Sequence, residues 1–236
     1  MATYITLVNE LLRRLNEVTL DTSGQGFSTT RNVQALAKDA VNNSIRLILQ
    51  DGQEWPFLKV TYTQTLFDGT SQYDFPTTLS TVDWDSFYLK KSTTTNNSPK
   101  ALNVISYNDY VKTYRANDDS AGTGIGSPEL IYQTQGSKFG VTPIPNDAYE
   151  IEYVYFSYPN DLTLYNDVCV IPDRFKHVII DGAMMFIMRF RSNEQSAQVH
   201  QQNFLNGIKA MRRILLDDNL YLRSTVINRG GTQQVF

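Results

Sequence analysis

The sequence predicts an α+β protein: a helical bundle formed by N- and C-terminal helices, with an inserted, mainly antiparallel β domain and an extended C-terminal tail. Two patterns predict this order. In both terminal parts of the chain apolar residues recur every three or four positions, which is the period of an amphipathic helix. Between them, aromatic and β-branched residues alternate with polar ones, which is the period of a strand.

The composition is that of a globular protein with nearly balanced charge. Of the 236 residues, 41% are hydrophobic and 19% are charged, and the formal net charge is −3. This balance argues against a free DNA-binding domain, which carries a basic excess on one face. The single cysteine, Cys169, excludes an internal disulfide and a zinc site with several cysteines. No apolar run approaches the roughly 18 residues of a membrane span, so we expect no membrane partner.

Residues 1–55 are predicted to form the N-terminal helical hairpin of the bundle. The first helix covers residues 3–18, and the hydroxyl of Thr3 or Thr6 can cap its first turn. The second helix is expected to end at Gly52, because glycine readily adopts the left-handed conformation of a helix C-cap. The apolar stripes of this hairpin need a third surface on which to be buried.

Residues 56–170 are predicted to form the inserted β domain. A short helix is expected near 106–115, where Ser106 and Asp109 fit a capping pattern. The polar run 92–98 has no hydrophobic anchor and reads as an exposed loop. The strand candidates are residues 58–66, 72–75, 84–90, 130–135, 139–144 and 150–156.

Residues 171–218 are predicted to supply the C-terminal helices of the bundle. Pro172 suits the first position of a helix, where its missing N–H costs nothing, and Ser192 or Asn193 should separate two helices. Residues 219–236, the extended C-terminal tail, mix β-prone residues with two glycines. Such a segment is either disordered or docked on a neighbouring chain.

The sequence contains few of the groups that catalysis needs. His177 and His200 fall on different predicted helices without a metal-ligand pattern. Cys169 lies in an apolar run, where a buried structural side chain is expected. The glycines within 122–126 lack the spacing of a nucleotide-binding loop. We therefore expect no catalytic, cofactor or metal site.

Two pairs of carboxylates leave a hydrolase open as an alternative. Asp83 with Asp85, and Glu150 with Glu152, occupy alternate strand positions, so each pair is predicted to point to one face. Such a pair could raise one pKa for acid–base catalysis. A solvated sheet face is the preferred explanation, because no histidine, oxyanion donor or metal ligand accompanies either pair.

The aromatic content leaves a second alternative, a carbohydrate- or peptide-binding module. Its groove would be walled by Trp84, Phe87, Tyr88 and Tyr155. Aromatic residues on strands commonly pack in a core, however, and a small binding module would not need the predicted helices.

Five segments, in chain order, carry a resemblance to a known family: ATYITLVNELLRRLNEV, STTRNVQALAKDAVNNSIRLI, EWPF, VTPIPNDAYEIEYVYFSYP and VIPDRFKHVIIDGAMMF. They resemble the head-to-tail adaptor proteins of tailed bacteriophages, which include connectors similar to tail tubular protein A. The resemblance spans most of the chain.

The resemblance implies a structural virion protein and not an enzyme. Such proteins form a ring, usually dodecameric, at the neck of the virion, where it docks under the portal and continues the DNA channel into the tail. The implied partners are further copies of the chain, the portal protein above, and a tail nozzle or other tail protein below. Genomic DNA would pass through without sequence-specific binding, and a near-neutral charge suits this passage because a basic lining would hold the phosphates.

Two sets of residues are candidates for the implied contacts. In the C-terminal tail, the candidate portal-binding residues are Tyr221, Arg223, Val226, Ile227, Arg229, Val235 and Phe236. On the predicted helices, the candidate subunit-interface residues are Arg13, Arg14, Arg212 and Arg213. A solvated or salt-bridged helix face is the other explanation for these arginines.

Overall fold

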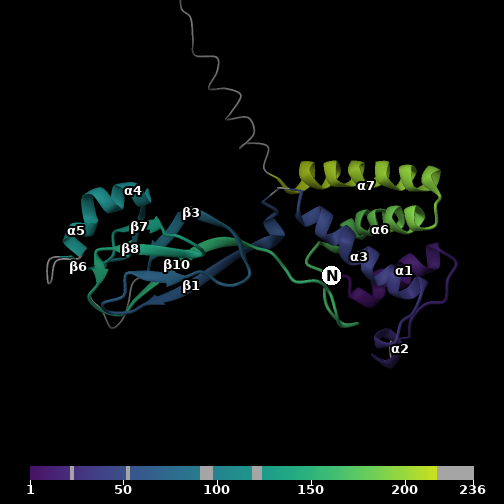
Figure 1. Cartoon of the computed structure of the whole chain (residues 1–236), viewed down its shortest axis with the longest axis horizontal. Helices are drawn as coiled ribbons and strands as arrows, with labels where there is room; N and C mark the ends of the chain where they lie inside the picture. Colours follow the sequence, from purple (N-terminus) through teal and green to yellow (C-terminus); the bar gives the residue numbers. More distant parts are fainter. Residues whose placement is uncertain (22–23, 52–53, 91–97, 119–123, 217–236) are drawn as a thin grey trace, which may run out of the picture. The chain divides into compact units, whose positions relative to one another are not determined.

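The computed structural model describes residues 1–21, 24–51, 54–90, 98–118 and 124–216. Helices and mainly antiparallel strands confirm the predicted α+β fold. Contacts between Cα atoms divide the chain into a helical unit, Met1–Phe57 with Pro159–Phe236, and a β unit, Leu58–Tyr158 (Figure 1). The β unit is therefore inserted between the two parts of the chain that make up the helical unit. The predicted C-terminal tail lies outside the described residues.

The helical unit is organised around one helix of which more than half the residues are buried. Its helices are α1 (Tyr4–Arg14), α2 (Gly24–Ser28), α3 (Val33–Leu49), α6 (Lys176–Phe190) and α7 (Glu194–Leu215), with a 3-10 turn at Asp173–Phe175. Helix α6 packs on both α3 and α7, and α1 packs on α3 and α6 (Figure 1). Because it has neighbours on several sides, α6 buries apolar side chains around most of its circumference.

Two glycines allow the helices to approach closely. A Cβ atom placed on Gly182 of α6 would lie 2.2 Å from Ser44 Oγ of α3 and 2.8 Å from the ring of Phe204 on α7. A Cβ atom on Gly207 of α7 would lie 2.7 Å from a methyl group of Val178. Any larger residue at these positions would push the helices apart.

Helix α1 is shorter than predicted at its C-terminal end. It ends at Arg14, and Asn16 follows with a φ of 56°. The N–H of Glu17 donates to the carbonyl of Leu12, and the N–H of Asn16 donates to the carbonyl of Arg13. This is the hydrogen-bond pattern of a Schellman cap, in which asparagine takes the place usually held by glycine.

Helix α3 ends at Leu49, and Gly52, predicted as its C-cap, lies outside the described residues. Two predictions about the starts of helices are wrong. Thr3 holds the N-cap position of α1, but its hydroxyl pairs with that of Thr6 at 2.7 Å and not with a backbone N–H, so the predicted hydroxyl cap is wrong. Pro172 precedes the 3-10 turn and is not the first residue of α6. The predicted break before α7 is confirmed, because Asn193 Oδ1 accepts a hydrogen bond of 3.2 Å from the N–H of Ser196.

The β unit contains two four-stranded sheets. The first has the order β1 (Lys59–Leu66), β10 (Tyr149–Ser157), β3 (Leu79–Leu89) and β4 (Lys100–Ala101), and all its pairings are antiparallel. The second has the order β2 (Gln72–Asp74), β8 (Lys138–Thr142), β7 (Leu130–Gln133) and β5 (Asn103–Ile105), in which β5 runs parallel to β7. Two further short strands, β6 (Ile125–Gly126) and β9 (Ile144–Pro145), pair in parallel.

Aromatic side chains from both sheets form the core of the β unit. Phe87 of β3 stacks on Tyr153 of β10, with ring centroids 4.6 Å apart. Phe139 of β8 contacts the ring of Phe75 at 4.9 Å. These four rings are buried together with aliphatic residues of both sheets, so the predicted alternation along the long strand β10 corresponds to a real inner and outer face.

A short helical segment connects the parallel strands β5 and β7. It consists of α4 (Tyr107–Asp109), a π-helical turn (Tyr110–Tyr114) and α5 (Arg115–Asp118), and it overlaps the region near 106–115 where a short helix was expected. Ser106 caps it as predicted, because its hydroxyl accepts a 3.1 Å hydrogen bond from the N–H of Asp109. The ring of Tyr110 stacks on Tyr132 of β7 at 3.8 Å, so the segment covers the outer face of this sheet.

Candidate functional site

The return segment, residues 159–172, has almost no regular secondary structure and docks on the N-terminus of α1. The N–H of Tyr4 donates to the carbonyl of Asp167 at 2.8 Å, and the N–H of Ile5 donates to the carbonyl of Tyr165 at 3.1 Å. The first turn of any helix leaves its N–H groups without partners inside the helix. In this protein, main-chain carbonyls of the return segment satisfy two of them.

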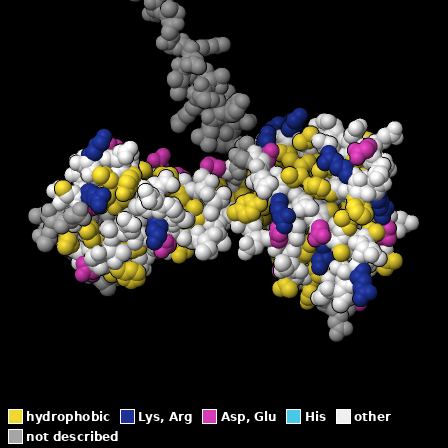
Figure 2. Space-filling view, in the orientation of Figure 1, with side chains coloured by type: hydrophobic (Ala, Val, Ile, Leu, Met, Phe, Trp, Pro, Cys, Tyr) yellow, Lys and Arg dark blue, Asp and Glu magenta, His cyan; other side chains and the backbone are white. Residues whose placement is uncertain are grey.

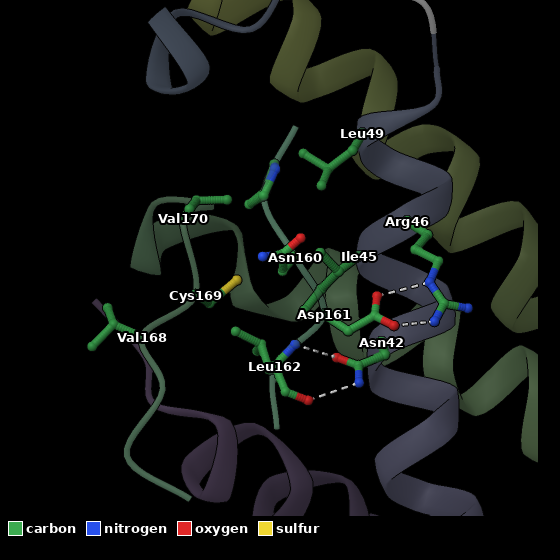
Figure 3. A pocket seen from close by; sticks show the side chains of 11 residues that line it. Asn42, Ile45, Arg46, Leu49, Asn160, Asp161, Leu162, Val168, Cys169 and Val170 are labelled. Atoms are coloured by element: carbon green, nitrogen blue, oxygen red, sulfur yellow. Dashed lines mark hydrogen bonds and ion pairs between the residues drawn. The ribbon is translucent and has the colours of Figure 1, made fainter. Parts of the chain in front are cut away.

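Helix α3 holds the same segment from a second side (Figure 3). The amide of Asn42 donates to the carbonyl of Leu162 at 3.0 Å and accepts from its N–H at 3.3 Å. One turn further along α3, the guanidinium of Arg46 binds both carboxylate oxygens of Asp161, with Nε 2.8 Å from Oδ1. Hydrogen bonding to Arg46 lowers the pKa of Asp161 below its ordinary value.

A side-chain carboxylate orders the exposed turn of the return segment. Asp167 accepts hydrogen bonds of 2.7 Å from the N–H groups of both Thr163 and Leu164. Both hydrogen bonds lower the pKa of Asp167, and the one from the N–H of Thr163 has the larger effect. The same residue therefore fixes the turn through its side chain and caps α1 through its carbonyl.

The space between the return segment and α3 is small and chemically inert. The cavity has a volume of about 60 Å³, whereas sites for small molecules usually have roughly 300–1,000 Å³. Cys169 lies on its wall, and burial raises the pKa of this thiol, which disfavours the reactive thiolate. The arrangement is that of a structural joint and not of a substrate pocket.

The predicted carboxylate pairs do not form a catalytic arrangement. Glu150 and Glu152 lie on the outer face of β10, where Glu152 pairs with Lys90 Nζ at 3.4 Å. Asp83 is the last paired residue before a bulge of β3 and Asp85 lies within this bulge, which interrupts the two-residue period on which their prediction rested. Among the described residues, no group of three or more His, Cys, Asp or Glu side chains could hold a metal ion.

The histidines also have structural surroundings. His200 Nδ1 of α7 lies 3.1 Å from Asp181 Oδ1 of α6, and Arg14 Nη1 of α1 lies 3.8 Å from the same oxygen. This network connects three helices of the bundle. His177 is exposed and forms no ion pair with another described residue.

The four aromatic residues proposed as the wall of a binding groove do not form one surface. Phe87 and Tyr155 are buried in the core, whereas Tyr88 is 43% exposed. Trp84 is half-buried and stacks on Phe87. The predicted wall is therefore wrong, because adjacent strand residues point to opposite faces.

A comparison with protein families now adds to this geometry. The family model described as SU10 adaptor protein matches residues 2–229. The chain belongs to the SU10 adaptor family. This is a phage head-to-tail adaptor family, so the predicted relationship is confirmed. A search among curated proteins found no match.

Membership of the SU10 adaptor family is consistent with a structural protein of the virion. Such adaptors are not an enzyme family, in agreement with the inert joint described above. Across the described part of the chain, none of the helices has both the length and the apolar character needed to span a bilayer.

The structure separates the four candidate interface arginines of the adaptor into two groups. Arg14 pairs with Glu10 at 3.3 Å, and Arg212 pairs with Asp51, so both are engaged inside the helical unit. Arg13 and Arg213 are exposed and form no ion pair with any other described residue. The candidate portal-binding residues of the tail, from Tyr221 to Phe236, lie outside the described residues.

Sequence reasoning missed the residues that build the joint of the adaptor. Asn42 and Arg46 lie between the apolar positions of the second predicted helix, and Asp161 and Asp167 follow the last strand candidate. The one available signal was the spacing of Thr163 and Asp167, which allows a carboxylate to bind backbone N–H groups nearby. The partners 120 residues apart, Asn42 and Leu162, gave no local signal.

Replacing Asn42 by leucine should destabilise the adaptor by about 1–3 kcal/mol, because the N–H and C=O of Leu162 would lose their partner in a partly buried site. Urea unfolding measures this change. The matched control is Asn203→Ala on the exposed side of α7, for which we expect a change within about 0.5 kcal/mol. Equal effects of the two substitutions would contradict the role of Asn42.

Acid should loosen the turn that Asp167 orders. The folded-state pKa of Asp167 is lowered, so its stabilising effect is complete above the ordinary aspartate pKa of about 3.9 and declines as the pH falls from there towards the lowered value. Hydrogen exchange of the Thr163 and Leu164 amides should therefore show lost protection in this range. In Asp167→Asn, which cannot ionise, this pH dependence should disappear; its persistence would assign the effect to another group.

Proposed function

We propose that the chain is one subunit of a dodecameric adaptor ring at the head–tail junction, docked under the portal and continuing the DNA channel into the tail. The observation that carries this proposal is the family match over residues 2–229, which takes in both units and much of the C-terminal segment. A ring of identical subunits arises when head-to-tail contacts repeat with a rotation that closes.

The surface chemistry supports a role as a conduit and not as a DNA-holding protein. The chain carries a formal net charge of −3. On the face in view in Figure 2, basic and acidic side chains are interspersed over the helical unit and do not gather in one basic patch. Binding to the DNA backbone depends on clusters of Lys and Arg, so this surface would let DNA pass.

We assign the contact with the portal to residues 219–236. This segment contains aromatic and β-branched residues that could anchor in a groove of another protein, with arginines as polar partners. A tail protein below the ring would contact other surfaces of the subunit.

Deleting residues 219–236 should abolish binding to the purified portal, because the anchoring side chains would be absent. Co-sedimentation of the two proteins measures the loss. A second variant, in which these 18 positions hold a glycine–serine sequence of equal length, separates the effect of sequence from that of length and should also fail to bind. Binding at full strength by either variant would contradict the assignment.

Arg13 and Arg213 should contribute to contacts between subunits, since neither is engaged within the described part of its own chain. The double substitution Arg13→Glu and Arg213→Glu should shift the mass distribution from rings towards monomers in mass photometry. The control is the double substitution Lys59→Glu and Lys112→Glu, an equal change of charge on the exposed surface of the β unit. Unchanged rings in the double variant would rule out this contact.

A further inference from the structure

A groove in the β unit has no role in the function proposed above. It has a volume of about 440 Å³ and runs beside strand β5. Its lining residues are Trp84, Val104, Ile105, Ser106, Tyr107, Gln133, Thr134 and Gln135. All of them belong to the β unit, so the groove is complete within this unit.

The groove follows an edge of the sheet beside which no other described strand lies. Strand β5 is the last strand of its sheet, and the N–H of Asn103 donates to the carbonyl of Glu129 beside β7. In a parallel ladder, alternate residues bond to the neighbouring strand. The N–H and C=O of Val104 therefore face the open side, and its side chain is 41% exposed.

Strand β3 of the other sheet also has an unpaired stretch of edge beside this groove. Strand β4 pairs with Tyr88 and Leu89 of β3, and the N–H of Leu102 donates to the carbonyl of Phe87. Among the described residues, only the part of β3 before Phe87 has no strand on that side. Trp84 of this open part lines the groove, and one face of its ring stacks on Phe87. Two open strand edges thus border one hollow, with an aromatic side chain between them.

The lining offers neutral polar groups that have no partner. The hydroxyl oxygen of Thr134 is buried and makes no hydrogen bond. Within the described residues, the side-chain amides of Gln133 and Gln135 also make none, and both side chains are exposed. None of the described residues that line the groove is charged, so a charged ligand would lose hydration there without gaining an opposite charge from them.

We propose that an extended, uncharged segment of a partner protein adds as a strand to the open edge of β5, between Trp84 and Tyr107. Its main chain would pair with the N–H and C=O of Val104, and its side chains would contact the two aromatic rings. With strand dimensions of about 3.3 Å by 4.8 Å and a sheet thickness of about 10 Å, the groove accommodates about three residues of such a strand. A neutral saccharide could stack on Trp84, but it would leave the strand edge without a matching main chain.

The test uses the full chain and a library of random seven-residue peptides displayed on filamentous phage. Enriched peptides are synthesised with blocked ends and titrated while tryptophan emission is recorded. Trp84 reports on the groove, and the only other tryptophan, Trp55, is fully buried in the helical unit and gives a constant background. We expect enriched sequences that are uncharged and β-prone, and a saturable change in emission.

Three changes should each weaken peptide binding by about tenfold or more. They are Val104→Pro, which removes the N–H at the open edge; Tyr107→Ser, which removes one aromatic wall; and N-methylation of the central residues of the peptide, which leaves the protein and its folding untouched. The control Tyr88→Ser removes an exposed aromatic residue of β3 outside the groove and should bind normally.

Several outcomes would overturn the proposal. These are a failure to enrich any peptide, enrichment of charged peptides, or binding that N-methylation and both groove variants leave unchanged. A saturable response to maltoheptaose without one to peptides would assign the groove to saccharides instead. None of these results depends on ring formation or on the portal, so the groove and the adaptor ring are tested separately.

Discussion

The docking of the return segment on α1 and α3 is the constraint on which the helical unit depends. This unit is assembled from two parts of the chain separated by the whole β unit, and residues 159–172 are where the second part begins. An irregular segment can be packed against helices only if its main-chain polar groups find partners. Here the first N–H groups of α1 and the amide of Asn42 provide them. The 3-10 turn and α6 come directly after this segment in the chain. Helices α1, α3 and α7 all pack on α6.

The same features explain why the protein suits assembly better than catalysis. Its polar groups are used to connect elements: Arg46 with Asp161, Arg212 with Asp51, and His200 with Asp181. The cavity at the joint is too small for a substrate. Within the described residues, the surfaces that we propose for contacts with other molecules are the exposed arginines on the helices and the neutral groove with an open strand edge in the β unit. An adaptor must contact several different proteins at once, and separate surfaces on separate units meet this need.

The sequence predicted those elements that are determined by a local pattern of residues. Its predictions were wrong where contacts between distant residues determine the structure. Strand β10 could be predicted because alternate residues, such as Ile151 and Tyr153, are apolar or aromatic and are buried. Ser106 was recognisable because it caps a helix three residues away. In contrast, the bulge of β3 depends on Ser86, whose hydroxyl takes the place of a strand partner for the N–H of Val154. The return segment was assigned to the β domain because it follows β10, whereas its contacts place it with the helices. No pattern within this segment could have shown that Asn42 holds it.

Native-state hydrogen exchange of the full chain tests the central claim most directly. If the return segment is an integral part of the helical unit, the amides of Tyr4, Ile5 and Leu162 will exchange only when the whole unit opens, with the same opening free energy as the buried amide of Ile45 in α3. If these three amides exchange rapidly while Ile45 stays protected, the segment is a peripheral loop, and the helices hold together without it.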